Sequence, residues 1–297
     1  MLLLSCPAKV FIAGEYLVLN GGPALVACLG PRFELEVSRG SGDVKGIHPD
    51  SPAGKLLASQ SWFSDYDLRF IDPQQGRGGL GASTAQFLFV YALAQWKETV
   101  WEGNHTLSPW SLLESYQDFA WSGRGKKPSG ADLLSQWRGG ITKFSPQGRE
   151  LEAVPWNFSG QKIYFLRTGE KVPTHDHLAE LGDFSSAELE RALRRVVRGL
   201  SALDLDEFAN GIQAYGRELA NLGFLTKNSL SLLHDLSWAP GVLAAKGCGA
   251  MGADFLLALV NSTEERAFKN WAGEAGLECL EFSTAEPGLQ VRVQGNL

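Results

Sequence analysis

The residues best suited to chemistry in this chain lie in a glycine-rich segment, Gly76 to Ala85, that leads into an apolar stretch. Glycine lets a backbone approach a ligand closely. The stretch from Gln86 to Thr99 is expected to be a helix, and the first N–H groups of a helix have no partner within it. Such N–H groups bind anions, and phosphate above all. The segment is therefore predicted to bind phosphate, with a simple turn at a helix start as the alternative.

Two well-known phosphate loops do not fit this segment. Gly76, Gly78 and Gly81 have the spacing of the dinucleotide-binding fingerprint, but a polar stretch separates them from the preceding strand. No strand ending in an acidic residue follows about 20 residues later either. A P-loop requires Lys-Ser or Lys-Thr after its last glycine, where this chain has Ala82 and Ser83.

Three further charged residues stand at the ends of expected elements. Lys9 precedes a short apolar strand, Glu15 follows it, and Asp132 follows Ser129-Gly130 at an expected helix start. A fixed lysine can stabilise charge that develops during phosphoryl transfer, and an ionised aspartate can act as a base or metal partner. Outside such a site, they would be surface charges and a first-turn acid that favours the helix dipole.

Composition limits the classes of protein to which the chain can belong. Its 297 residues are 44% hydrophobic and carry a net charge of −6, which argues against a general binder of nucleic acids or membranes. The four cysteines form no C-x-x-C pair, which argues against a disulfide framework or a zinc site and favours a cytoplasmic location. No segment reaches the ~20 apolar residues of a membrane span.

The elements that would position these residues follow from hydrophobic patterning. Strands are expected at 10–13, 16–19, 24–29, 33–37, 67–71, 141–144, 162–167, 255–260 and 290–293, with a turn at 20–23. A helix is expected to start at Pro109, with Ser108 as its N-cap, and another at Ala131. Ser185 and Glu188 form a capping box that opens a long helix, and further helices follow up to about residue 237. A last helix is expected over 263–275.

The pattern of expected strands and helices changes near Pro155, where an irregular stretch ends. Strands dominate before this point, and helices mix with strands after it. We therefore expect an α+β protein of two domains, residues 1–155 and 156–297.

Four segments together resemble the GHMP kinases, the superfamily of galactokinase, homoserine kinase, mevalonate kinase and phosphomevalonate kinase. Pro7 to Tyr16 is similar to the first family motif, and Gly79 to Ala85 is similar to the family's phosphate loop. Ser129 to Asp132 matches the segment with the catalytic aspartate, and Lys246 to Asp254 looks like the third motif. One such segment would be a weak signal, but these four occur in the family's order.

The resemblance implies a two-domain GHMP fold: an N-terminal mixed sheet with helices, a C-terminal ferredoxin-like α/β sandwich, and a cleft between them. It implies an ATP- and Mg²⁺-dependent kinase with Lys9 and Asp132 as catalytic residues and Ser83 as a Mg²⁺ ligand. The nucleotide would be bound by Gly78, Gly79, Leu80, Gly81, Ala82, Ser83 and Thr84. The acceptor would be bound by Glu15, Tyr16, Ser129, Gly130, Lys171, Thr174, Gly249 and Ala250.

Several residues depart from the family pattern. Cys248 stands where Ser or Thr is usual, Met251 replaces a glycine, and Arg124 lies where mevalonate kinases carry a metal-binding glutamate. Either Mg²⁺ is held by fewer protein ligands with phosphate and water, or the chain is a degenerate nucleotide-binding homologue.

The resemblance narrows the acceptor to a small anionic metabolite of the mevalonate pathway. Gly14-Glu15-Tyr16 is similar to the phosphomevalonate kinase form of the first motif, whereas Lys171 to Thr174 is similar to the substrate loop of mevalonate kinase. Phosphomevalonate is thus placed slightly ahead of mevalonate, and homoserine or a sugar stays open, as does a homodimer. An acidic chain must gather cations locally for such an acceptor; those near the motifs are Lys9, Arg77, Lys126, Lys127, Arg138 and Lys171.

Overall fold

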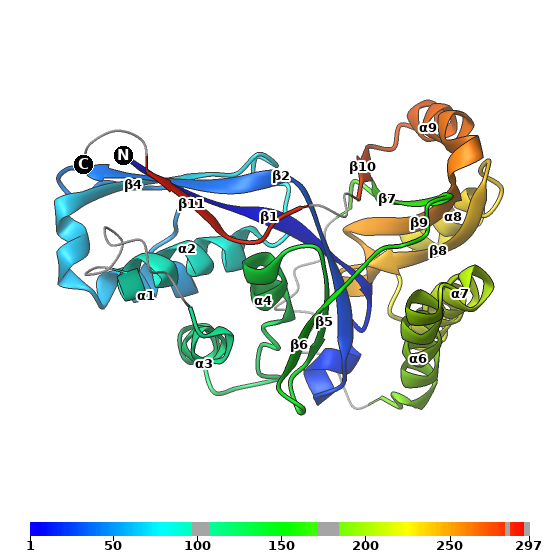
Figure 1. Ribbon diagram of the computed structural model, residues 1–297, viewed down its shortest axis with the longest axis horizontal. Coiled ribbons are helices and arrows are strands. Elements are labelled where there is room, and N and C mark those ends of the chain that lie inside the picture. The colour runs from blue at the N-terminus through cyan, green and yellow to red at the C-terminus, as the bar shows by residue number, and fades with distance from the viewer. Residues whose placement is uncertain (97–106, 171–183, 283–285, 294–297) are drawn as a thin grey trace.

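The computed structural model describes residues 1–96, 107–170, 184–282 and 286–293, which form two sheets with helices packed against them (Figure 1). The first sheet has strand order β11-β1-β2-β4-β3, with β5 paired to β2 and β6 paired to β5. Its strands are β1 (Leu2–Ala13), β2 (Ala24–Arg39), β3 (Val44–Lys45), β4 (Tyr66–Ile71), β5 (Ile141–Ser145), β6 (Glu150–Val154) and β11 (Gln290–Val293).

Strand β2 organises the first sheet because its two halves pair with different strands. Ala24 to Ala27 pair with β5, and Glu34 to Arg39 pair with β4. The two strands expected at 24–29 and 33–37 are therefore one strand, which continues through a cis peptide bond at Gly30-Pro31. In the second half apolar residues are buried and the glutamates between them are partly exposed, as in a sheet covered on one face.

Helices cover the inner face of the first sheet (Figure 1). They are α1 (Pro52–Ala58), α2 (Ala82–Trp96), α3 (Pro109–Ala120) and α4 (Ala131–Arg138). Phe87 to Val90 of α2 are fully buried, because this helix is apolar on every side and lies inside the core. Helix α4 contacts β1, β2, β5 and α2, so its first turn is held at the centre of this half of the molecule.

The second sheet is antiparallel, with strand order β10-β7-β9-β8. Its strands are β7 (Gln161–Arg167), β8 (Val242–Cys248), β9 (Phe255–Asn261) and β10 (Cys279–Glu281), and its helices are α6 (Ala187–Ala202), α7 (Leu205–Asn221), α8 (Lys227–Leu236) and α9 (Glu265–Glu274). Alternate residues of β7 enter two separate apolar clusters, Phe165 with residues of α6 and α7, and Tyr164 with residues of α8 and α9. The helices therefore cover both faces of this sheet.

The last described strand returns to the first sheet, where β11 pairs with Leu2 to Ser5 of β1. Arg32 fastens the segment before β11, since its guanidinium donates to the Pro287 and Gly288 carbonyls and to Glu286. Because the chain crosses between the two sheets twice, the division into residues 1–155 and 156–297 stays a prediction.

Most of the expected elements are confirmed, with two local corrections. Tyr16 to Leu19 do not form a strand, because Leu17 to Asn20 make a 3-10 turn that ends at a left-handed Gly21. Helix α6 begins after Ser186 rather than Ser185, and the hydroxyl of Ser186 bonds Glu190 without capping the helix. Ser108 does cap α3, as its side chain accepts from the Ser111 N–H.

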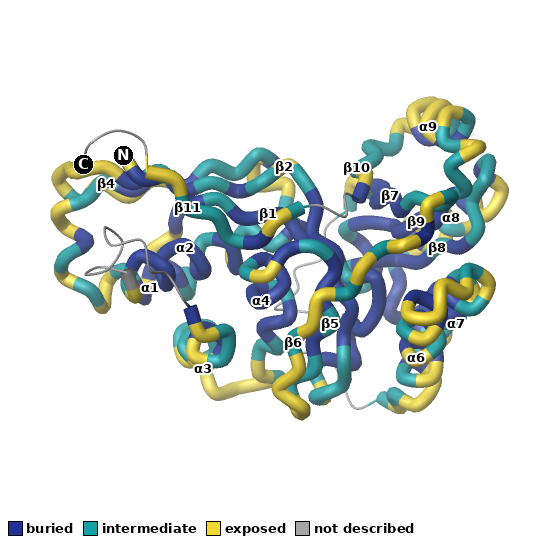
Figure 2. The backbone as a smooth tube through the Cα atoms, viewed as in Figure 1, coloured by how far each residue is buried: buried dark blue, intermediate teal, exposed yellow. Residues whose placement is uncertain are grey.

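Buried residues gather in the strands of both sheets and on the inner faces of the helices, and exposed residues follow the outer faces of α6, α7 and α9 (Figure 2). All four cysteines are free, and three of them are buried. Within the described part of the chain, no helix is long and apolar enough to cross a membrane.

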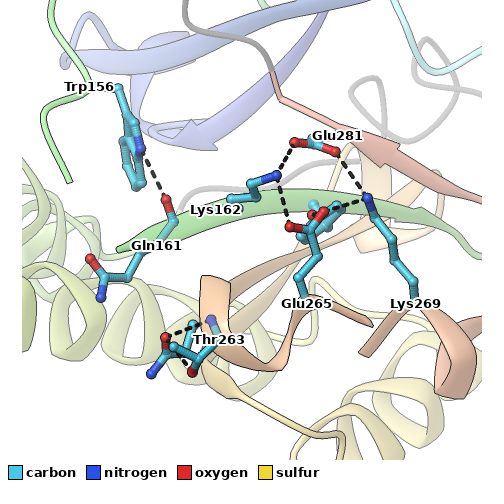
Figure 3. A network of polar contacts seen from close by, with 9 residues as sticks. Trp156, Gln161, Lys162, Thr263, Glu265, Lys269 and Glu281 are labelled. Atoms are coloured by element: carbon cyan, nitrogen blue, oxygen red, sulfur yellow. Dashed lines mark hydrogen bonds and ion pairs between the residues drawn. The ribbon is translucent and has the colours of Figure 1, made fainter. Parts of the chain in front are cut away.

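An ion-pair network on the second sheet joins β7, β10 and α9 (Figure 3). Lys162 lies between Glu265 and Glu281, and Lys269 contacts the same two carboxylates. Hydrogen bonds from Lys269, Lys162 and Tyr164 lower the pKa of Glu265 to about 2. The ionised form of Glu265 is therefore favoured in the folded protein.

We expect this network to stabilise the protein at neutral pH and to be lost in acid. The folded-state pKa of Glu265 lies below its unfolded value, so its contribution is complete above about pH 4.5 and falls as the pH drops towards about 2. Glu265→Gln should remove this part of the acid dependence, measured as urea stability against pH. Glu274→Gln, an exposed residue of the same helix, should leave the acid dependence unchanged; equal behaviour of the two variants would contradict the assignment.

Candidate active site

The site is built where the outer edge of β1 loses its strand partner. Strand β11 covers that edge only up to Ser5, and the register with β2 shifts between Cys6 and Ala8. Beyond this point the glycine-rich loop takes the edge, since the Lys9 N–H donates to the Leu80 carbonyl at 3.1 Å. The loop is thus attached to the strand that carries Lys9.

Lys9 and Asp132 meet across this edge, with the Lys9 Nζ 2.8 Å from the Asp132 Oδ2. Lys9 is 9% exposed, so its ammonium is held in place by its surroundings. Asp132 lies in the first turn of α4, which starts after Gly130 in the left-handed conformation (φ 75°). Glycine is favoured at residue 130 because other residues are strained at this φ, and a Cβ there would also lie 2.0 Å from the Leu113 Cδ1, so that the leucine would have to move.

The glycine-rich loop ends at the N-terminus of α2, as expected for phosphate binding. Gly76, Gly78, Gly79 and Gly81 all have positive φ angles. The helix begins at Ala82, four residues before the expected start at Gln86, so Ser83 and Thr84 belong to its first turn. Ser83 is exposed and Thr84 is buried, which leaves the Ser83 hydroxyl accessible to a ligand at the helix start.

The third motif packs directly against this loop. A Cβ on Gly79 would lie 2.9 Å from the Asp254 Cβ, and a Cβ on Gly249 would lie 2.3 Å from the Asp254 Oδ2. Met251 adopts φ 54°, a left-handed conformation that glycine adopts more easily. The left-handed backbone explains why the resembled motif has a glycine at this position. Met251 adopts the same turn, but its backbone is strained there.

Glu15 is the buried partner of Lys246 and faces the interior. The Lys246 Nζ lies 2.5 Å from the Glu15 Oε1 and also donates to the Gly247 carbonyl and contacts the Cys248 Sγ at 3.3 Å. Burial opposes the charged form of Lys246, but the hydrogen-bonded Glu15 beside it outweighs this, so its pKa is raised. Burial raises the pKa of the Cys248 thiol to about 11, and the thiol is therefore a neutral packing group.

Tyr16 is buried as well and links the first motif to the third. Its hydroxyl accepts from the Met251 N–H at 3.0 Å, and its ring stacks on Phe224 with 4.3 Å between ring centres. Burial raises the pKa of Tyr16 above its usual value, and so the hydroxyl stays protonated. In this structure Glu15 and Tyr16 connect the two sheets.

The other residues expected around the acceptor fall in different places. The Ser129 hydroxyl accepts from the Ala131 N–H at the start of α4, and Ala250 is buried in the third loop beside Gly249. Lys171 and Thr174 lie outside the described residues.

Of the cations expected to gather in one cleft, Lys9 contacts Asp132, but others have different partners. Arg77 pairs with Glu278 at 2.6 Å, and Lys126 donates to the Asn20 side chain at 2.9 Å. Lys127 lies over the Trp121 ring, 5.8 Å from its centre. Less positive charge is therefore free for an anionic acceptor than the sequence suggested.

Gln136 is part of this site and the motifs gave no sign of it. The residue is fully buried on α4, and its amide contacts β1, the glycine-rich loop and Thr84. A signal was present in the sequence, because a glutamine four residues after Asp132 lies on the same face of a helix.

Comparisons with known proteins bear on what this site is. No protein-family model matches the chain. Among curated proteins, the mevalonate kinase of Aeropyrum pernix is 24% identical over 97% of each chain. Mevalonate kinase from Methanococcus jannaschii has a TM-score of 0.71 at 13% identity, covering 99% of this chain and 98% of that one.

Two further structures belong to the same superfamily. Phosphomevalonate kinase from Streptococcus pneumoniae, with phosphomevalonate and AMPPNP, has a TM-score of 0.73 at 17% identity, covering 94% of this chain and 98% of that one. Galactokinase from Lactococcus lactis has a TM-score of 0.74 at 14% identity, covering 97% and 94%. The chain has the fold of the GHMP kinases. Its curated relative and these structural neighbours are small-molecule kinases of the GHMP type.

The contact between Gly79 and Asp254 can be tested with two matched variants. Gly76→Ala and Gly79→Ala both place a side chain at a positive φ, but only residue 79 has Asp254 in its way. We expect Gly79→Ala to weaken ATP binding about tenfold or more and Gly76→Ala to change it little, measured by calorimetric titration. Similar affinities for the two variants would show that the loop does not depend on this contact.

The buried pair of Glu15 and Lys246 should be important for stability. Lys246→Met should lower the free energy of unfolding by about 3–5 kcal/mol, because Glu15 is left as an unpaired buried charge. Lys143→Met, which removes a surface pair with Glu150 and Glu152, should cost under about 1 kcal/mol. Urea denaturation measures both, and combining Lys246→Met with Glu15→Gln should recover part of the loss.

Proposed function

We propose that this protein transfers the γ-phosphoryl group of ATP to an oxygen of a small acidic metabolite of the mevalonate pathway. The observation that carries the proposal is the contact of 2.8 Å between Lys9 and Asp132, beside a glycine-rich loop that opens a helix. Phosphoryl transfer needs positioning and electrostatic stabilisation more than covalent chemistry from the protein. This arrangement supplies both.

The glycine-rich loop, Lys9 and Asp132 would each have a different role in the transfer. Backbone N–H groups of the glycine-rich loop and of the first turn of α2 would bind the phosphates of ATP. Lys9, held with little exposure, would stabilise the charge that develops on the transferred group. Asp132, 2.8 Å from the Lys9 Nζ, would orient the acceptor and take its proton.

The donor set fits a magnesium ion held mainly by ATP. Within the described ranges, no three or more His, Cys, Asp or Glu side chains come together as a metal site. Mg²⁺ ordinarily keeps several waters and binds through one or two protein groups with substrate phosphates. Ser83, exposed in the first turn of α2, is the group that would reach it. When bound, the ion would neutralise charge between the phosphates.

For the acceptor, we propose mevalonate ahead of phosphomevalonate, in the reverse of the order that the sequence motifs favoured. The sequence argument for phosphomevalonate used Tyr16, but Tyr16 is 3% exposed and bonded to Met251. Phosphomevalonate, which carries a phosphate in addition to its carboxylate, also needs more cations than mevalonate, and Arg77 is paired with Glu278. The curated relative, matched over 97% of both chains, is a mevalonate kinase. We place mevalonate first and phosphomevalonate second.

The altered third motif does not favour a degenerate homologue. Cys248 is buried between Lys246 and the Phe11 carbonyl, and Met251 preserves the left-handed turn. Both substitutions are accommodated by local packing and backbone conformation. Lys9, Ser83 and Asp132 are all present at the proposed phosphate site.

Replacing Asp132 tests the proposed chemistry. Asp132→Asn keeps the shape of the side chain but removes the base, so turnover should fall by about 10³-fold or more while thermal stability changes little. Asp118→Asn, an exposed acid on α3, should keep normal turnover. ADP release in a coupled assay measures both, and near-normal turnover of Asp132→Asn would refute the assignment.

The same assay identifies the acceptor when mevalonate, phosphomevalonate, homoserine and galactose are compared side by side. We expect the highest kcat/KM with mevalonate. A higher value with phosphomevalonate would select the second candidate, and activity only with homoserine or galactose would reject the pathway assignment. ATP binding without transfer to any acceptor would favour the degenerate homologue.

A further inference from the structure

Gln136 occupies the point where three parts of the proposed site meet. It lies on α4 one helical turn after Asp132, and it is fully buried. A buried amide needs hydrogen-bond partners, because burying a polar group without them is costly. The partners that Gln136 finds all belong to the parts that surround the proposed phosphate site.

The amide nitrogen of Gln136 donates to two backbone carbonyls. Its Nε2 lies 2.9 Å from the Pro7 oxygen and 3.1 Å from the Gly81 oxygen. Its Oε1 lies 2.6 Å from the Thr84 Oγ1. One side chain therefore ties together the strand before Lys9, the last glycine of the loop and the first turn of α2.

These bonds replace contacts that regular structure does not provide. Pro7 lies at the register shift of β1, outside the pairs that join β1 to β2, so its carbonyl needs another donor. Gly81 precedes α2 at φ 90°, where a side chain would be strained, and its Cβ would lie as close as 3.0 Å to the Gln136 Nε2 and 3.1 Å to the Lys9 Cε. The glutamine thus fills a space that Gly81 keeps open.

We propose that Gln136 is a positioning residue that fixes the glycine-rich loop relative to Lys9 and Asp132. It acts through Gly81 and Pro7. Because Asp132 and Gln136 share one helix, a movement of the loop away from the glutamine changes the distance between bound phosphates and the Lys9–Asp132 pair. The expected effect of Gln136 on ATP binding rests on the proposed function, whereas the contact between Gln136 and the glycine-rich loop does not depend on it.

Gln136→Met is the direct test, because methionine has similar size but cannot donate. We expect the Kd and KM for ATP to rise about tenfold, the loss of about one net hydrogen bond, while the KM for the acceptor changes less than twofold. The matched control is Ser135→Ala, a fully buried neighbour whose hydroxyl bonds only within α4 and does not reach the loop. A purely structural role would reduce the active fraction of both variants and leave the KM for ATP unchanged.

Gln136→Glu provides a second variant if methionine impairs folding. An ionised glutamate cannot donate to the Pro7 and Gly81 carbonyls. The Lys9 side chain, which approaches Gly81 beside this amide, favours the ionised form of the introduced carboxyl. At about pH 8 the Kd for ATP of this variant should therefore rise about tenfold, as for Gln136→Met, and an unchanged Kd would contradict the inference.

Hydrogen exchange separates this inference from the proposed function. In Gln136→Met, the amides of residues 81–85 should exchange at least about tenfold faster than in wild type, while those of α3 keep their rates. Unchanged exchange at 81–85, or an equal change in Ser135→Ala, would overturn the inference. If wild type phosphorylates no acceptor, the proposed function fails, and the exchange comparison still decides whether Gln136 holds the loop.

Discussion

The candidate site depends on the edge of β1 that faces away from β2, because β11 and the glycine-rich loop pair with successive parts of that edge. Strand β11 pairs with that edge up to Ser5, a register shift frees Pro7, and the glycine-rich loop binds the edge again at Lys9. Each backbone group at this edge must find a partner when it is buried. The loop, α4 and β1 are brought together because each supplies partners that another lacks.

The two sheets are also coupled by buried polar contacts near the site. Lys246 of the second sheet pairs with Glu15, which follows the first strand, and Tyr16 accepts from the Met251 N–H. The third motif contacts the glycine-rich loop where Asp254 lies against Gly79. Motifs far apart in the sequence therefore depend on each other for their shape. This dependence gives a physical reason why Glu15 and Lys246 occur within motifs although neither reaches an exposed surface.

Glycine and charge have specific places in this acidic protein. Several glycines of the motifs, in the glycine-rich loop and at residue 130, have positive φ angles, where other residues would be strained or would collide with neighbours. Positive charge is used sparingly, since Lys9 is buried beside Asp132 while Arg77 is neutralised by Glu278. Such a site favours phosphates bound largely by backbone N–H groups.

The sequence by itself determined the α+β class and most strands and helices. It also indicated that Lys9, the glycine-rich loop and Asp132 could serve one reaction, phosphoryl transfer. Periodicity and capping residues are local properties, and for this reason Ser108 could be recognised in advance as the N-cap of α3. Only the tertiary structure decided the partners of buried groups. It turned Glu15 and Tyr16 inwards and brought Gln136 to Pro7 and Gly81, because those contacts join residues distant in the chain. No local pattern encodes such pairings, since they arise from the packing of whole elements.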